Sequence, residues 1–217
     1  LMGHPALVAD CVKAMQDAVS IPVTVKHRIG INGRDSYAEL CDFVGQVREA
    51  GCRSFTVHAR IAILEGLSPK ENREIPPLRY GVAAQLKQDF PDLHLSINGG
   101  VSSFDAVRDH LQAMDGVMVG RAAYHQPWDI LGRADLLWDQ EPPFATPLDA
   151  AQAMRPRIEA HLARGGRLHQ IGRHMLGLFH GRPGARGWRR ILSEGVARAE
   201  APAEALAVYD AALAEVA

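Results

Sequence analysis

The sequence has little of what marks secreted, membrane-spanning or metal-binding proteins. Its 217 residues include three cysteines, Cys11, Cys41 and Cys52, with neither C-x-x-C spacing nor a Cys/His pattern that would hold a metal. We therefore predict no metal site and interpret all three as reduced intracellular thiols that pack in the core. No apolar run approaches the roughly 18 to 20 residues of a membrane helix, and no signal peptide opens the chain. These absences predict a cytoplasmic protein that does not bind a membrane.

The remaining composition is that of a globular protein. Hydrophobic residues make up 47% of the chain and the formal net charge is -1, which suits one domain or one and a half. The chain enters a helical pattern directly after Leu1, without the Met or processed small residue that begins a natural chain. We therefore expect a piece cut from a longer protein.

Short β-rich runs alternate with helical patterns along the first two thirds of the chain. We expect strands at residues 22–26, 55–58, 93–97 and 117–119, and helices at residues 4–19, 36–50, 78–90, 103–114 and 124–138. This alternation predicts parallel βαβ units with right-handed crossovers. Four units are half of an eight-unit barrel, which typically needs about 250 residues. A small open doubly wound sheet is the alternative.

A second domain follows a proline-rich linker near residue 140. We predict an α/β fold, the C-terminal half of a (β/α)8 TIM barrel over residues 1–140, followed by a small all-α domain over residues 141–217. Residues 150–198 hold ten Arg, no Lys and two Glu, a net charge of +8. This excess is compatible with a solvated helical surface or with a phosphate-binding face, on which Phe179 and Trp188 would stack on bases.

Functional groups of parallel barrels sit at the C-terminal ends of the strands. Each expected strand here ends in such residues: Lys26, then His58, then Asn98-Gly99-Gly100, then Gly120-Arg121. A lone Lys or His there is more often solvated or structural. Two consecutive units that end in glycines before a helix indicate a phosphate site, and a lysine across the mouth would stabilise the negative charge of a reduced flavin. Together the four ends suggest FMN.

The same segments resemble the tRNA-dihydrouridine synthases, in particular the bacterial branch that acts on D-loop uridines. The matching stretches are residues 21–30, 58–60, 66–78, 97–100, 120–124 and 173–193. Residues 66–78 read Gly-Leu-Ser-Pro-Lys-Glu-Asn-Arg-Glu-Ile-Pro-Pro-Leu, which is highly specific. The resemblance spans nearly the whole chain.

This resemblance implies a flavin site, an RNA surface and a reaction. FMN would be held by Lys26, His58, Asn98, Gly99, Gly100, Gly120 and Arg121. The helical domain would grip tRNA, with contacts from Lys70, Arg73, Gln170 and Arg173. NADPH would reduce the flavin, which would pass hydride to the uracil ring of a flipped-out uridine. A cysteine after the fourth barrel strand would then protonate the neighbouring carbon.

We expect no catalytic residue in this chain, because that cysteine would lie upstream of Leu1. A half-barrel would also leave two strand edges unpaired and an apolar inner face uncovered. We therefore expect this chain alone to be inactive and to aggregate or self-associate, and the complete protein to be a monomer. The alternatives are a non-catalytic RNA-binding fragment, or another FMN-dependent barrel oxidoreductase such as an ene-reductase, against which the basic helical domain argues.

Overall fold

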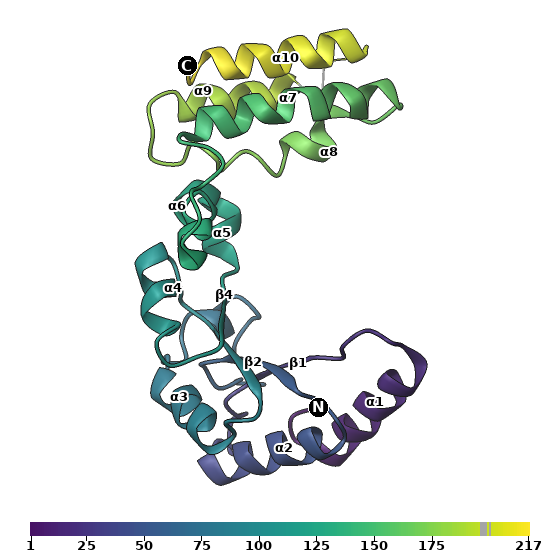
Figure 1. The fold of residues 1–217 in the computed structure, drawn as a ribbon, viewed down its shortest axis with the longest axis vertical. Helices are drawn as coiled ribbons and strands as arrows, with labels where there is room; N and C mark the ends of the chain where they lie inside the picture. The colour runs from purple at the N-terminus through teal and green to yellow at the C-terminus, as the bar shows by residue number, and fades with distance from the viewer. Residues whose placement is uncertain (196–198, 200) are drawn as a thin grey trace. The chain divides into compact units, whose positions relative to one another are not determined.

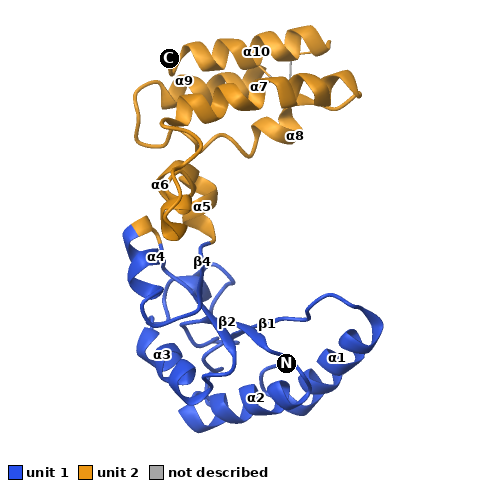
Figure 2. Ribbon diagram, viewed as in Figure 1, with its two compact units in different colours: residues 1–101, 105–119 blue, residues 102–104, 120–217 orange. Residues whose placement is uncertain are grey.

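The computed structural model describes residues 1–195, 199 and 201–217. Contacts among these residues divide the chain into two compact units, coloured separately in Figure 2. The first comprises Leu1–Val101 and Asp105–Val119, and the second comprises Ser102–Phe104 and Gly120–Ala217. The domain boundary expected after residue 140 therefore falls inside the second unit.

The first unit is built on a parallel sheet (Figure 1). Its strands are β1 (Val25–Arg28), β2 (Ser54–His58), β3 (His94–Asn98) and β4 (Gly116–Met118). They are hydrogen-bonded to one another in chain order, β1-β2-β3-β4, and every pair is parallel. A doubly wound sheet reverses its strand order at a switch point, and the described strands have no such reversal. The predicted half-barrel order of four parallel strands is confirmed.

One helix precedes β1 and three others follow β1, β2 and β3 in turn; residues of the first three helices pack in one core with one face of the sheet. The helices are α1 (Pro5–Ala18), α2 (Tyr37–Glu49), α3 (Tyr80–Asp89) and α4 (Phe104–His110), with the 3-10 turn η1 (Glu71–Arg73) between β2 and α3. Helix α2 begins at a capping box: the Ser36 hydroxyl accepts from the Glu39 amide, and the Glu39 carboxylate accepts from the Ser36 amide. Its buried residues, such as Val44 and Val47, pack in one core with Phe55 and neighbouring strand residues.

The opposite face of the sheet is polar on β1 to β3, and on β4 it carries Met118. Because side chains alternate along a strand, the residues one step away from the buried Phe55, Val57, Leu95 and Ile97 point away from the helices. On this face lie Lys26, Arg28, Thr56, His58, His94, Ser96 and Asn98. The expectation of an apolar inner face was wrong for β1 to β3, because the apolar residues of these strands belong to the helix-covered side. Strand β1 also begins and ends later than predicted, so Lys26 lies within it instead of at its end.

The second unit is helical. It contains α5 (Arg121–His125), α6 (Pro127–Leu131), η2 (Ala134–Trp138), α7 (Pro147–Ala163), α8 (Leu168–Gly172), α9 (Ala185–Arg190), the π-helical turn η3 (Ile191–Gly195) and α10 (Pro202–Ala214). The single helix expected over residues 124–138 is three short pieces, because Pro127 starts a new helix and Gly132 ends it. Helices α7 to α10 share a core around Ile158, Trp188 and Tyr209. Within the described part of the chain, no helix is long and apolar enough to cross a membrane.

Candidate functional site

Three polar side chains line up across the C-terminal ends of the first three strands. Arg28 on β1 pairs in register with His58 on β2, which pairs with Asn98 on β3. Lys26 lies one step earlier on the same face of β1 and pairs with Thr56. The fold therefore brings the predicted residues Lys26, His58 and Asn98 to one edge of the sheet, with Arg28 beside them.

This edge gathers several cations from β1 and the loop after β2. Burial, and then the charge of Arg28, lowers the pKa of Lys26. Burial also lowers the pKa of Arg28, with Arg60 and Arg73 adding repulsion. Among the described residues, no carboxylate forms an ion pair with Lys26, Arg28 or Arg60, and the Arg60 Nε is buried without a hydrogen-bond partner. Mutual repulsion of this kind favours an anionic ligand.

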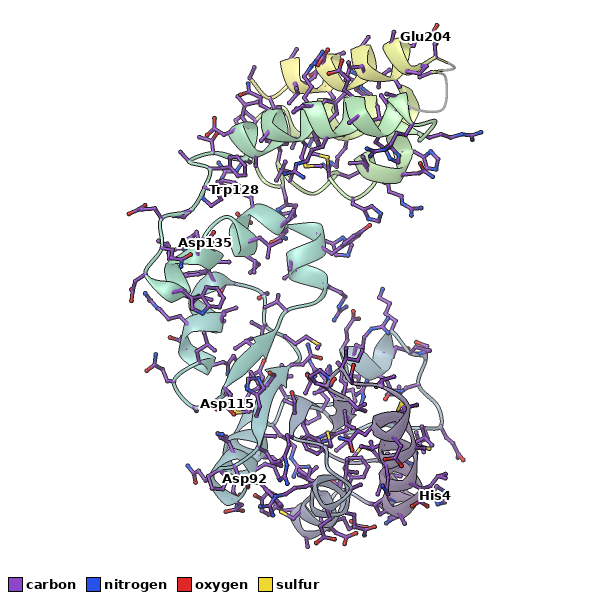
Figure 3. The ribbon with its side chains drawn as sticks, turned by 45° about the vertical axis from the view of Figure 1, so that its right-hand side comes forward. His4, Asp92, Asp115, Trp128, Asp135 and Glu204 are labelled. Carbon is purple, nitrogen blue, oxygen red and sulfur yellow. The ribbon has the colours of Figure 1, made fainter. Side chains whose placement is uncertain are left out.

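The N-terminal edge of the same sheet is neutralised instead. Asp92, just before β3, binds Arg48 at 2.9 Å and Arg53 at 3.3 Å. Asp115, just before β4, binds Lys87 at 2.8 Å. Both aspartates are labelled in Figure 3. At the C-terminal edge Arg79 pairs with Asp35 at 3.1 Å, whereas Lys26, Arg28 and Arg60 have no described carboxylate partner. Barrel proteins place their sites at this edge.

Gly99 and Gly100 follow β3 with positive φ angles of 110° and 70°. A methyl group on Gly100 would lie 2.5 Å from Leu78 Cδ1 and 2.9 Å from the Tyr80 hydroxyl, and one on Gly99 would lie 3.2 Å from His58 Nε2. The Tyr80 hydroxyl also donates to the Gly99 carbonyl at 2.6 Å. Packing within the first unit therefore already requires glycine at both positions, with or without a phosphate.

Gly120 and Arg121 belong to the second unit, where Gly120 is the N-cap of α5 and Arg121 its first residue. Helix α5 has only five residues. A methyl group on Gly120 would meet no atom within 4 Å, so no contact among the described residues requires glycine there. The phosphate role of this pair stays a prediction.

Sequence reasoning missed Arg28, which fixes the loop between β2 and α3. Its Nη1 donates to the carbonyls of Ile61 and Asn72, both at 2.8 Å. The Asn72 side chain in turn accepts from the Ile63 amide at 2.8 Å and donates to the Ile63 carbonyl at 2.7 Å. Lys70 and Arg73, the predicted RNA contacts of this loop, flank Asn72 and are exposed. The available signal was the position of Arg28, two residues after Lys26 on the same strand face.

The Arg-rich segment of the second unit is only partly neutralised. Arg155 forms a two-pronged pair with Asp210, at 2.7 and 2.9 Å, and Arg190 lies 3.8 Å from Glu215. Both carboxylates come from the C-terminal end of the chain, beyond the segment with the +8 balance. Arg198 lies outside the described residues. Among the described residues of this segment, the exposed arginines without an ion pair are Arg157, Arg164, Arg167, Arg173, Arg182, Arg186 and Arg189.

The expected base-stacking role of Phe179 and Trp188 is wrong. Trp188 is 0% exposed and Phe179 is 2% exposed. Their rings pack against each other with centroids 4.9 Å apart, and Trp188 also packs against Tyr209 and donates its Nε1–H to the Met175 carbonyl at 3.0 Å. They form the core of the helical unit, because a large apolar ring is most stable away from water.

The two predicted RNA contacts near α8 differ in their surroundings. The Gln170 side-chain oxygen accepts from the Arg167 amide at 2.9 Å and lies 2.9 Å from His161 Nε2, so it caps α8. Arg173 is exposed and donates its Nε–H to His174 Nε2 at 3.0 Å. Gln170 thus has a structural role, and Arg173 presents charge to solvent.

The cysteines occupy three different environments. Cys52 is buried, and burial raises the pKa of its thiol. Cys41 is half-buried against the core, but Cys11 is exposed on α1, so its interpretation as a core residue was wrong. In the described part of the chain, no group of three or more His, Cys, Asp or Glu side chains is arranged to hold a metal ion.

A family match and three similar proteins all carry the name dihydrouridine synthase. Residues 1–216 match a family described as "Dihydrouridine synthase (Dus)". The chain is similar to proteins named tRNA-dihydrouridine(20/20a) synthase: it is 65% identical over 213 residues to that of Pseudomonas aeruginosa, 62% identical over 213 residues to that of Pseudomonas putida, and 57% identical over 203 residues to that of Escherichia coli K12. These alignments cover 98%, 98% and 93% of this chain, and 63%, 62% and 59% of the relatives. The chain therefore spans less than two thirds of the length of these relatives.

Proposed function

Because the chain belongs to the dihydrouridine synthase family, we propose that it serves the flavin-dependent reduction of uridine to 5,6-dihydrouridine in the D-loop of tRNA. The names of its relatives specify positions 20 and 20a. We propose the same uridines for this protein, and the cytoplasm as the place where it meets tRNA.

The observation that carries this proposal is the cation-rich edge at the C-terminal ends of β1 to β3, where no described carboxylate pairs with Lys26, Arg28 or Arg60. FMN is anionic at its phosphate and, when reduced, at its ring, so it fits a site with excess positive charge. Bound FMN, reduced by NADPH, would supply the hydride for the uracil ring. Lys26, partly desolvated, would stabilise negative charge on the ring more strongly than a lysine in water.

The other predicted residues would orient the cofactor. The Asn98 Nδ2 donates to the Met118 carbonyl at 2.7 Å, so its Oδ1 is left as an acceptor on the polar face of the sheet. His58, with 8% exposure, lies next to Gly99 and Gly100 at the same edge. We assign the phosphate to Gly120 and Arg121, because a guanidinium recognises phosphate through paired hydrogen bonds.

The proposed RNA contacts include exposed cations of each unit, taken separately. Lys70 and Arg73 lie on the loop that Arg28 and Asn72 hold, and Arg173 lies on the helical unit. Gln170 would support the Arg173 contact by capping α8. Lysines and arginines that neutralise phosphates release counterions, so tRNA affinity should fall steeply as salt rises.

The test uses the complete protein, with Lys26→Ala compared against Lys13→Ala. Lys13 is an exposed lysine on α1 that pairs with Asp17, so it controls for loss of a charge. We expect purified protein to contain FMN and to form dihydrouridine in unmodified tRNA with NADPH. Lys26→Ala should slow reduction of the flavin by roughly 10- to 100-fold, the effect of one well-placed charge.

Two results would contradict the proposal. The first is equal flavin reduction rates in the two variants, which would remove Lys26 from the site. The second is salt-dependent tRNA binding by a protein that never takes up flavin, which would favour the alternative of a non-catalytic RNA-binding protein.

A further inference from the structure

Arg173 is held by a chain of two hydrogen bonds within the second unit. Its Nε donates to His174 Nε2 at 3.0 Å, and His174 Nδ1 lies 3.1 Å from the Tyr124 hydroxyl. The rings of Tyr124 and His174 meet edge to face, with centroids 5.9 Å apart at 74°. The three side chains come from the end of α8, the turn after it, and α5.

These contacts orient the imidazole between two partners. With Nε2 accepting from the guanidinium, the tautomer that completes both contacts has its hydrogen on Nδ1, which donates to the Tyr124 hydroxyl oxygen. His174 thus occupies one edge of Arg173 and leaves the two Nη groups of the guanidinium without a partner among the described residues.

Helix α5, which carries Tyr124, packs tightly against the turn after α8, which carries His174. A methyl group on Gly177 would overlap the main-chain carbonyl oxygen of His125, so the turn after α8 lies directly against α5. The Gln126 side chain also approaches His180 at 3.5 Å between the two Nε2 atoms. The short helix that carries Tyr124 therefore packs directly against the segment that carries His174.

We propose that His174 and Tyr124 are positioning residues that hold Arg173 ready to bind a tRNA phosphate. The inference rests on the proposed function, since it presumes that Arg173 contacts RNA. An arginine loses rotamer freedom when it binds, and a guanidinium already oriented through its Nε loses less of it. The free Nη groups then match the paired oxygens of a phosphate.

A double-mutant cycle in the complete protein tests the inference, with tRNA dissociation constants measured over a range of salt concentrations. Arg173→Ala should weaken binding about tenfold and reduce the slope of log K against log salt by about 1, because one phosphate contact is lost. His174→Ala removes no positive charge from the phosphate contact but should weaken binding about three- to tenfold, through the freedom regained by Arg173. Tyr124→Phe should act in the same direction and less strongly.

The decisive measurement is His174→Ala in the Arg173→Ala background, where we expect no further loss of affinity. His174→Gln, which offers an acceptor near the position of Nε2, should restore most of the wild-type affinity. His169→Ala on α8 is the matched control and should bind as wild type, because the exposed side chain of His169 makes no hydrogen bond in the described structure. Flavin content should be unchanged in all of these variants.

The measurements distinguish failure of the positioning role of His174 from failure of the proposed RNA contact of Arg173. Additive losses in the double variant, or full affinity in His174→Ala, would overturn the positioning role while leaving Arg173 as an RNA contact. Unchanged affinity in Arg173→Ala would refute the RNA contact itself, and the positioning role would fall with it.

Discussion

Acid should destabilise the first unit through His27, which lies on the helix-covered face of β1. Its side chain is 5% exposed and packs against Phe43 and Phe55, with ring centroids 5.2 and 5.8 Å away. Nδ1 bonds to the Arg28 carbonyl at 2.7 Å, and Nε2 has no hydrogen-bond partner in the described structure. Burial lowers the pKa of His27 to about 4, against a smaller opposing effect of the bond to Arg28.

Acid lowers the stability because the unfolded chain takes up a proton at His27 at a higher pH than the folded chain does. The unfolded chain binds a proton at His27 below its ordinary pKa of 6.5, whereas the folded chain resists it until about pH 4. Stability from this residue is therefore complete above pH 6.5 and is lost as pH falls from 6.5 to 4. The whole shift corresponds to about 3 kcal/mol, of which about 2 kcal/mol is lost between pH 7.5 and pH 5.

The assay must report on the first unit alone. All three tryptophans, Trp128, Trp138 and Trp188, belong to the second unit, so tryptophan fluorescence would miss the effect. Native-state hydrogen exchange of buried amides in α2 and β2 gives the local opening free energy instead. His27→Phe keeps an aromatic ring beside Phe43 but cannot take up a proton.

We expect the opening free energy of the wild type to fall by about 2 kcal/mol more than that of His27→Phe between pH 7.5 and pH 5. Equal losses in the two proteins would refute the reasoning and would place the acid sensitivity of this unit elsewhere.

Two further predictions concern the backbone around the site. Gly100→Ala should destabilise the first unit by about 1 to 3 kcal/mol in urea unfolding, because alanine is strained at φ 70° and its methyl group would meet Leu78. Gly81→Ala in α3, which meets no atom within 4 Å, should be neutral or stabilising by up to about 1 kcal/mol, and an equal loss in both would contradict this account. Asn72→Ala should expose the loop of residues 59–79 to limited proteolysis and weaken tRNA binding with flavin content unchanged, since three side-chain hydrogen bonds are lost. A loop as resistant as in the control Gln85→Ala would show that Asn72 does not hold it.

The local patterns in the sequence were sufficient for the class of the fold. Alternating β-rich and helical runs predicted four parallel strands, and the strands exist in that order because each βαβ unit is encoded by neighbouring residues. The strand-end positions of His58 and Asn98 followed from the same reasoning, since the end of a strand is marked by the residues next to it. Helix breaks at Pro127 and Gly132 were also readable in principle, because both residues act on their own backbone.

What the sequence could not decide was which surfaces face each other. Trp188 was expected at the RNA surface, but it is buried because Phe179 and Tyr209 close around it from other parts of the chain. The charge of Arg155 is neutralised by Asp210, 55 residues away. Such contacts depend on how helices pack after the chain has folded, and no local pattern records them. The tertiary structure therefore decided which cations remain available for a ligand.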